Sequence, residues 1–239
     1  MPDENSAISS LPGHAGRGGR MTAVQQVYAD LRDLIVGMSL PPGTVISKKE
    51  IADRYGISQT PVREALILLE EEGLVDIFPQ SRTEVSYIDV QSAREAHFLR
   101  RSVEVEIAHI LAAEITDAQI AELRDIIAHQ KAADGLGDYA AFTRHDNAFH
   151  ERMYQMAGVG GLWPLIDARR AHLDRLRRLH LPSKGKTSAI IKDHTDIVDA
   201  IAARNAAQAE VSVREHLKGT VSATEDIRSH FPEYFGKLA

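Results

Sequence analysis

An aspartate and a histidine stand one helical turn apart in residues 140–158, AAFTRHDNAFHERMYQMAG. At helical spacing, Asp146 and His150 fall on the face that also carries Phe142 and Phe149. An ionised carboxylate in an apolar interior is costly unless it is paired or bound to a metal ion. The pair therefore raises the question of which other polar side chains this face meets.

Two later helical segments also direct an imidazole toward an apolar face. His194 is in line with Ile190 and Ile197, and His216 lies beside Val213. One carboxylate and three imidazoles suit a divalent cation, because imidazole favours zinc, nickel or iron and a carboxylate widens the choice to manganese. The pattern predicts a metal site, with zinc as the first choice, and its ligands are Asp146, His150, His194 and His216.

The alternative is that each of these histidines is a core residue with satisfied hydrogen bonds. For a single histidine this alternative would be preferred, and the D-x-x-x-H spacing together with two more inward imidazoles favours the metal. The remaining histidines are interpreted as surface or packing residues: His14, His97, His109, His129, His145, His172, His180 and His230.

The elements that must position these ligands lie in residues 89–239, where every segment carries the helical period. Helices are expected at about 91–113, 117–133, 138–157, 160–180, 187–204 and 206–229, separated by Gly and Pro. They predict an antiparallel bundle of about six helices.

Residues 21–88 have a different character. A helix from about Thr22 to Val36 is followed by SKKE at 47–50, a capping box, and by a third helix capped by Ser58. Alternation on both sides of a polar centre at 74–88 predicts a β-hairpin. This order is typical of a winged helix-turn-helix. Residues 1–20 are rich in Gly, Ser, Pro and Ala, and we expect a disordered tail.

In a winged helix-turn-helix, the first residues of the second motif helix meet base edges in the major groove. Here those residues are Gln59, Thr60 and Arg63. The residues expected to hold phosphates or a minor groove are Arg32, Lys48, Lys49 and Arg82. The charge of residues 21–88 argues against DNA, since they hold six Lys or Arg and ten Asp or Glu. This objection is weakened because the acids at 70–72 and 76 lie at the far end of the third helix, away from the face proposed to enter the groove.

Bulk properties fit a globular protein of the cytoplasm. The 239 residues are 44% hydrophobic and 26% charged, carry a net charge of −6 and include no cysteine, which leaves no disulfide or thiolate chemistry. The first ten residues are not those of a secretory signal. No apolar run approaches the roughly 20 residues that span a bilayer.

The segment 31–75 closely resembles the N-terminal domain of the GntR family of bacterial transcription regulators, above all in S-x-T-P-V-R-E-A-L and L-x-x-E-G-L-V. The resemblance implies that Arg32 and Arg63 match DNA-contact positions. Gln59 stands where an Arg is usual, and the hairpin tip PQSRT lacks the frequent Gly. Both departures affect which operator sequence is recognised, and they do not argue against DNA binding.

Residues 89–230 resemble the helical ligand-binding domain of the FadR-type GntR regulators, the FCD domain. The matching motifs are D-x-x-F-H-x-x-M-x-x-x-A-G at 146–158, H-x-x-I-x-x-A-I at 194–201 and V-x-x-H-L at 213–217. The resemblance implies that the four proposed ligands occupy the metal positions of the family. It also implies the metal-binding branch of the family, not the branch that binds fatty acyl thioesters.

Arg100 lies at the edge of the core-facing stripe of the first bundle helix, and a guanidinium there can take a carboxylate in bidentate fashion. The resemblance places an effector-contacting Arg in this helix. The alternative for Arg100 is a surface salt bridge with Glu104, and Arg101 is the second candidate for the effector. A cluster of arginines is interpreted as a solvated face: Arg169, Arg170, Arg175, Arg177 and Arg178.

These features predict a transcriptional regulator, a repressor in the first instance. It would bind a palindromic operator as a homodimer and respond to a small carboxylate effector at the metal. Two alternatives remain open. One is a metal-dependent enzyme, against which stand the absence of HExxH and of a nucleophile elbow. The other is a regulator whose bundle only dimerises.

Overall fold

The computed structural model describes Leu11 and residues 21–236. The predicted tail, 1–20, lies outside the described residues except for Leu11. That leucine is fully buried in the N-terminal core, and its carbonyl accepts hydrogen bonds from Arg54. A disordered tail is therefore the wrong description of this one position.

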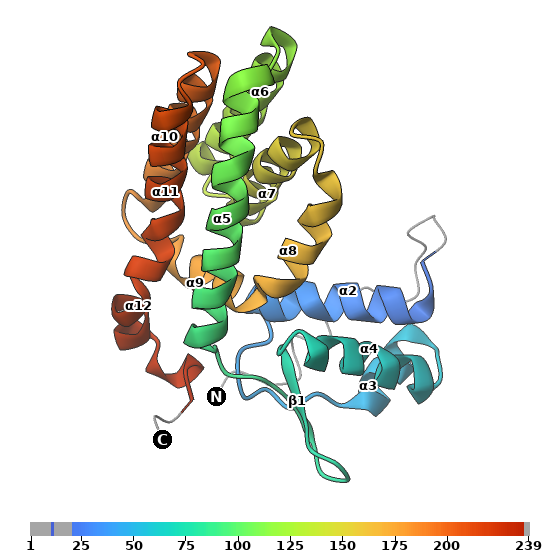
Figure 1. The fold of residues 1–239 in the computed structure, drawn as a ribbon. Coiled ribbons are helices and arrows are strands. Elements are labelled where there is room, and N and C mark those ends of the chain that lie inside the picture. Colours follow the sequence, from blue (N-terminus) through green and yellow to red (C-terminus); the bar gives the residue numbers. More distant parts are fainter. Residues whose placement is uncertain (1–10, 12–20, 237–239) are drawn as a thin grey trace.

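The N-terminal domain has three helices and a hairpin, as the sequence predicts (Figure 1). Thr22 caps α2 through a full capping box with Gln25, Ser47 caps α3, and Gly56 ends α3 in the left-handed conformation at φ 65°. Ser58 stands at the N-cap of α4, where its hydroxyl makes no capping bond. The helices span Ala23–Val36 (α2), Lys48–Tyr55 (α3) and Gln59–Glu71 (α4).

The wing is an antiparallel pair of strands, β1 (Val75–Ile77) and β2 (Thr83–Val85). Val75 pairs with Val85 and Ile77 with Thr83, so both valines point into the core while the tip projects from the domain (Figure 1). Gln80 in the turn has φ 57°. Gln80 thus adopts the left-handed conformation that usually favours glycine.

The C-terminal domain is a helical bundle, and its long helices α5, α6, α10 and α11 run nearly along one direction in Figure 1. The largest core cluster joins α5, α6, α7, α10 and α11. The helices span Val90–Glu114 (α5), Asp117–Gly135 (α6), Tyr139–Met156 (α7), Trp163–Arg169 (α8), Ala171–His180 (α9), Lys186–Ala202 (α10), Ala206–Ser222 (α11) and Thr224–His230 (α12), with short 3₁₀ turns at Gly160–Leu162 (η1) and Pro232–Tyr234 (η2).

Two of the predicted helices are broken. The segment 160–180 divides at Arg170, whose backbone leaves helical geometry at φ −97° and ψ 8°. The buried guanidinium of Arg170 bonds to Asp167 and Asn147 and stacks over Trp163, and these contacts accompany the break. The segment 206–229 divides at Ala223, after which α12 turns to pack on α9.

Helix α9 connects the two domains, because it contacts α2 on one side and α5 and α11 on the other. Ala171 at its start belongs to the core of the N-terminal domain, while Leu173 and Leu176 pack in the bundle. Any displacement of α9 therefore acts on both cores. Among the described residues, no helix has the length and apolar character needed to cross a membrane.

Candidate metal centre

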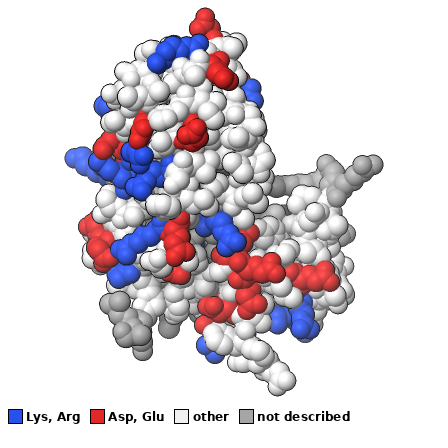
Figure 2. Space-filling model, in the orientation of Figure 1, with Lys and Arg blue, Asp and Glu red and all other residues white. Residues whose placement is uncertain are grey.

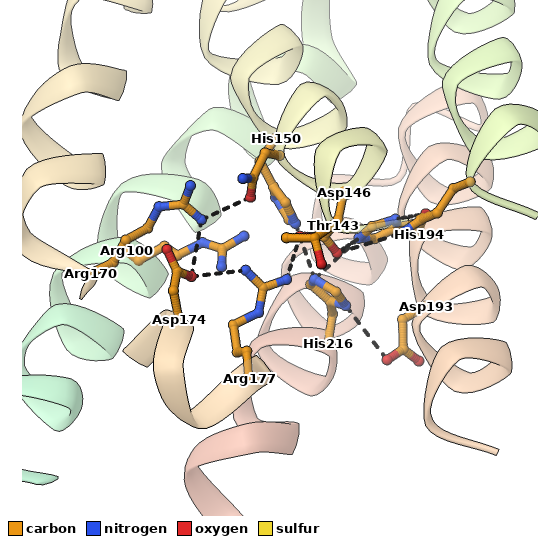
Figure 3. A network of polar contacts seen from close by, with 12 residues as sticks. Arg100, Thr143, Asp146, His150, Arg170, Asp174, Arg177, Asp193, His194 and His216 are labelled. Atoms are coloured by element: carbon orange, nitrogen blue, oxygen red, sulfur yellow. Dashed lines mark hydrogen bonds and ion pairs between the residues drawn. The ribbon is translucent and has the colours of Figure 1, made fainter. Parts of the chain in front are cut away.

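The four predicted ligands converge at one point inside the bundle (Figure 3). Asp146 and His150 come from α7, one turn apart, and His194 and His216 come from α10 and α11. Their ligand atoms all lie within 4.8 Å of one another. None of the four side chains is more than 8% exposed. This burial distinguishes the three histidines of the cluster from those histidines of the described residues that face solvent.

Aromatic packing fixes the rings in place. Phe149 stacks on His194 with centroids 4.1 Å apart and planes at 17°, and it meets His150 edge-on at 5.3 Å. His150 in turn stacks on His216 at 5.2 Å. The apolar face that suggested this site in the sequence is thus the wall that orients it.

Each imidazole directs Nε2 toward the centre and Nδ1 toward an outer oxygen. His194 Nδ1 lies 2.8 Å from Gln130 Oε1, and His150 Nδ1 lies 2.9 Å from Glu104 Oε2, though not in the line of an ideal hydrogen bond. His216 Nδ1 is 3.6 Å from Asp193 Oδ2. Outer acceptors of this kind hold the proton on Nδ1 and leave Nε2 as a free ligand.

Sequence reasoning did not identify Glu104 and Gln130 as members of the site. Both are almost fully buried, on α5 and α6. Glu104 entered only as a surface partner for Arg100. The only indication in the sequence was that each of these polar side chains lies within the apolar stripe of its helix. Periodicity alone does not distinguish such a buried position from one at the edge of the stripe.

The protonation states favour a cation at the centre. Burial opposes ionisation of Asp146, but the guanidinium of Arg177 outweighs it and holds the pKa of this carboxyl well below its usual value. Burial and then Arg100 lower the pKa of His150 to about 4, and burial and then His216 lower that of His194 well below its usual value. Neutral imidazoles and an ionised carboxylate are the forms that bind metals.

The spacing of the inner atoms fits one ion. His216 Nε2 lies 3.2 Å from His150 Nε2 and 3.3 Å from His194 Nε2, and His194 Nε2 lies 3.6 Å from Asp146 Oδ1. Two ligands held about 2.1 Å from a metal lie roughly 3.0 to 3.4 Å apart at octahedral or tetrahedral angles. The two His–His distances fall in this range, and the Asp146 oxygen at 3.6 Å lies slightly beyond it. Three nitrogen lone pairs aimed at one another repel unless a proton or a metal cation lies between them. The cluster could therefore bind a metal ion.

The arginines around this cluster differ from expectation. Arg170 and Arg175 are fully buried, and Arg177 forms an ion pair with the metal-site carboxylate of Asp146, so the interpretation as a solvated face is wrong for these three. Arg175 donates to the carbonyl of Ser86, at the link between the two domains. The structure explains the error: α9 lies between two cores, so both of its faces are covered.

Arg100 lies inside the bundle, 2% exposed, and its Nε donates to Glu104 Oε1 at 2.6 Å. The surface salt bridge that was the alternative for Arg100 is therefore a buried one. Its Nη2 is buried and has no hydrogen-bond partner among the described residues. Arg100 lines a cavity of about 20 Å³ together with the candidate ligand His216, whereas Arg101 does not line it.

A larger cleft of about 410 Å³ reaches the other side of the cluster. Its lining includes Asp146, Arg177 and Lys186 of the bundle and Arg32 of the N-terminal domain. A molecule in this cleft would touch a predicted metal ligand and the DNA-binding domain at once.

The proposed base-reading residues lie together at the start of α4. Gln59, Thr60 and Arg63 are exposed, and Lys49 is exposed on the preceding helix while Lys48 is half-buried. Arg82 is at the wing tip, paired with Glu84 at 2.6 Å and stacked over Phe78. These positions leave one continuous end of the domain open to a duplex.

The acids of this domain gather elsewhere. Glu70, Glu71, Glu72 and Asp76 line a cleft at the junction with the bundle, where Figure 2 shows acidic side chains concentrated. Eleven residues of helix separate Gln59 from Glu70, a distance of about 16 Å. Four of the ten acids of residues 21–88 are therefore displaced from the proposed base-reading end, while Glu50, Glu64 and Glu84 lie on the elements of that end.

Arg32 does not lie with the other DNA-binding candidates. Its Nε is 2.8 Å from Glu72 Oε2, and its Nη2 bonds to the carbonyl and carboxylate of Asp167 on α8 at 2.8 and 3.2 Å. The DNA contact predicted for Arg32 does not fit this conformation, because the guanidinium is held at the domain junction.

A winged helix joined to a helical bundle with a buried Asp-His₃ cluster defines a DNA-binding protein with a candidate metal centre. Residues 23–85 match the bacterial regulatory proteins of the gntR family, and residues 95–219 match the FCD domain. The chain belongs to the GntR family of helix-turn-helix regulators, in the FadR-like group with a C-terminal FCD domain.

Curated relatives and solved structures agree with this assignment. An uncharacterised regulator of Streptomyces ambofaciens is 37% identical over 88% of this chain and 89% of its own. The transcriptional repressor RspR of Escherichia coli K12 is 30% identical over 89% and 93%. The structure of E. coli McbR, at 18% identity, shares the fold with a TM-score of 0.72 over 89% of this chain and all of that one. These relatives are transcriptional regulators, not enzymes.

Proposed function

We propose that this regulator is a cytoplasmic homodimeric repressor whose affinity for a palindromic operator is set by a small organic acid at a metal site in the bundle. The observation that carries the proposal is the convergence of Asp146, His150, His194 and His216 on one buried point. Zinc is the first candidate for the ion, and nickel, manganese and iron suit the same donors.

Arg100 supports the effector half of the proposal. Its unpartnered Nη2 lies beside the ligand His216 in the small cavity, so a carboxylate there would receive a charge-assisted hydrogen bond. The bound metal would hold the same carboxylate as a Lewis acid. Arg100 would then fix the orientation of the acid, while Glu104 keeps the guanidinium in position.

A row of ion pairs connects the centre with the DNA-binding domain, and Figure 3 shows its part from Asp146 to Arg170. Asp146 bonds to Arg177, which shares Asp174 with Arg170. Arg170 then pairs with Asp167 at 2.7 Å, and Asp167 holds Arg32 of α2. Any ligand that displaces the side chain of Asp146 or Arg177 would change the arrangement of these ion pairs. An effector must prefer one of its arrangements in order to change operator affinity.

At the other end of the molecule, Gln59, Thr60 and Arg63 would enter the major groove, with Lys48, Lys49 and Arg82 on the backbone or minor groove. In this proposal Arg32 leaves the junction if it reaches DNA. Two such domains in a dimer would read the two halves of a palindrome.

The test is a gel-retardation series with the DNA upstream of the protein's own coding sequence. Wild-type protein should retard this DNA, and Arg63→Ala should weaken binding by roughly 10- to 100-fold, as expected for loss of a base contact. Removal of metal with EDTA should change the affinity of the wild type. A metal-site variant, Asp146→Ala with His194→Ala, should show no response to EDTA. Equal EDTA responses in the two proteins would contradict the sensor role.

A further inference from the structure

Lys186, the first residue of α10, is a charged group near the site to which the proposed function gives no role. Its side chain is half-buried and makes no hydrogen bond or ion pair in the part of the chain that the structure describes. It lines both the 20 Å³ cavity beside His216 and the 410 Å³ cleft beside Asp146. Lys186 therefore stands where the two spaces meet.

Gly219 makes room for this ammonium. A Cβ at Gly219 would lie 2.7 Å from Lys186 Nζ, so any larger residue would displace the charge. Gly219 follows the ligand His216 by three residues on α11, which places the ammonium about one helical turn from that ligand. The lysine thus reaches inward from α10 to α11 through a gap left by a missing side chain.

The charges around the centre call for an anion. The cationic groups lining the small cavity are Arg100, Arg177 and Lys186. The carboxylates that serve as ligand or contact a ligand ring are Glu104, Asp146 and Asp193. Asp174 also contacts Arg177 and is shared with Arg170, so adding this pair leaves four positive and four negative groups in balance. A divalent cation then leaves a surplus of about two positive charges in a buried site, which is costly without compensation.

The positions of the unsatisfied donors indicate how such an anion is arranged. Arg100 Nη2 is buried without a partner on the inner side of the cavity, and Lys186 is open on the side of the cleft. Burial and the neighbouring Arg177 lower the pKa of Lys186, although Asp193 and Asp146 oppose the shift. A single carboxylate on Arg100 would leave the lysine without a counter-charge.

We propose that Lys186, admitted by Gly219, forms a second anion subsite, so that the effector is an organic acid with two anionic groups. One group lies at the metal and Arg100, and the other, a carboxylate or a phosphate, lies on Lys186. This inference rests on the proposed function of the centre and narrows its ligand class. It also assigns a role to a lysine that sequence reasoning passed over.

Calorimetric titration of the full-length, zinc-loaded protein tests the subsite with two matched pairs of acids. Malate differs from lactate by a second carboxylate, and 3-phosphoglycerate differs from glycerate by a phosphate. In at least one pair the dianion should bind roughly 10- to 100-fold more tightly, the range for a hydrogen-bonded charge. The pair that shows the preference identifies the second group as carboxylate or phosphate.

Variants assign the preference to the lysine. Lys186→Gln should remove the advantage of the dianion over the monoanion. The exposed Lys184→Gln, two residues away, should behave as wild type. Gly219→Ala should act like Lys186→Gln by pushing the ammonium aside, and melting curves of all variants should match the wild type. Chelation of loose zinc by the acids is the same for every protein and cancels in the comparison.

Two results would overturn the inference while leaving the proposed function intact. One is equal affinity of monoanion and dianion in both pairs for the wild type, and the other is an equal loss of both acids in Lys186→Gln. A protein that retains zinc but binds none of the four acids would overturn the subsite together with the effector role of the centre.

Discussion

The spacing D-x-x-x-H occurs on α6 as Asp125 and His129 and on α7 as Asp146 and His150, with opposite outcomes. On α6 the two side chains are 71% and 59% exposed and lie 3.4 Å from each other. On α7 both are 1% exposed, and His150 turns its Nδ1 away from Asp146 toward Glu104. The spacing alone therefore only aligns two side chains on one face of a helix. A candidate metal site also requires ligands from other helices and hydrogen-bond acceptors behind the imidazole rings.

The largest expected effect is loss of the metal from the α7 site. EDTA should lower the melting temperature of the wild type by roughly 10 °C, because a ligand at 1,000 times its Kd contributes about 4 kcal/mol. Asp146→Ala with His194→Ala should melt at the same temperature with and without EDTA. The α6 pair supplies the matched control, since Asp125→Ala with His129→Ala should keep the full EDTA response. An unchanged wild-type melting curve in EDTA would remove the contrast between the two helices.

The second effect concerns the acceptor that only the α7 site has. Glu104→Gln should cost about 3 to 5 kcal/mol of unfolding free energy, because it leaves Arg100 buried without its counter-charge. It should also weaken zinc binding roughly 10- to 100-fold through His150. Urea unfolding and zinc competition with a chelating dye measure the two losses. The exposed Glu106→Gln on the same helix should change neither beyond about 0.5 kcal/mol.

His172 adds a third case to this comparison, because it is a buried imidazole that lies outside the candidate metal site. It accepts from the backbone N–H of Asp89 through Nδ1, and burial and then Arg175 lower its pKa to about 4. Since its ordinary pKa is 6.5, the unfolded chain binds the extra proton between these values. The neutral ring therefore contributes its full stability above pH 6.5, and about 3 kcal/mol is lost as the pH falls toward 4.

Urea unfolding in EDTA at pH 7.5 and pH 4.5, for the wild type and His172→Gln, measures this contribution. EDTA removes the separate pH dependence of metal binding. The gap in unfolding free energy between the two proteins should narrow at the lower pH. A gap of constant size would show that the ring does not titrate in this range.

The smallest effect lies at the end of the ion-pair row. Arg32→Gln should cost about 2 kcal/mol in unfolding free energy, since it removes charge-assisted hydrogen bonds of a side chain that is only 14% exposed. Its informative effect is on coupling, because operator affinity in this variant should respond less to EDTA than in the wild type. Arg124→Gln removes an exposed pair with Asp199 on the bundle and should leave the response intact. Equal responses in both variants would place the coupling elsewhere.

Much of this arrangement follows from the sequence because it depends on periodicity. The helices of both domains, the hairpin and the inward direction of Asp146, His150, His194 and His216 all follow from which positions are apolar at a spacing of three and four residues. Capping residues such as Thr22 and Ser47 fix the starts of their helices for the same local reason.

The rest depends on tertiary packing that no local pattern encodes. The arginines of α9 look like a solvated face because nothing in the sequence places α2 against that helix. The break at Arg170 is accompanied by a bond to Asn147 of α7, a partner that no local pattern reveals. Arg32 bonds to Asp167, 135 residues away, and so leaves the position that local resemblance gave it.

The most direct measurement is the metal content of purified protein by elemental mass spectrometry, with the two D-x-x-x-H pairs compared after dialysis against zinc. The wild type and the Asp125→Ala with His129→Ala variant should each retain about one ion per chain, and Asp146→Ala with His194→Ala should retain none. Equal zinc in all three proteins, or none in the wild type, would contradict the assignment of the metal centre to the convergence of α7, α10 and α11.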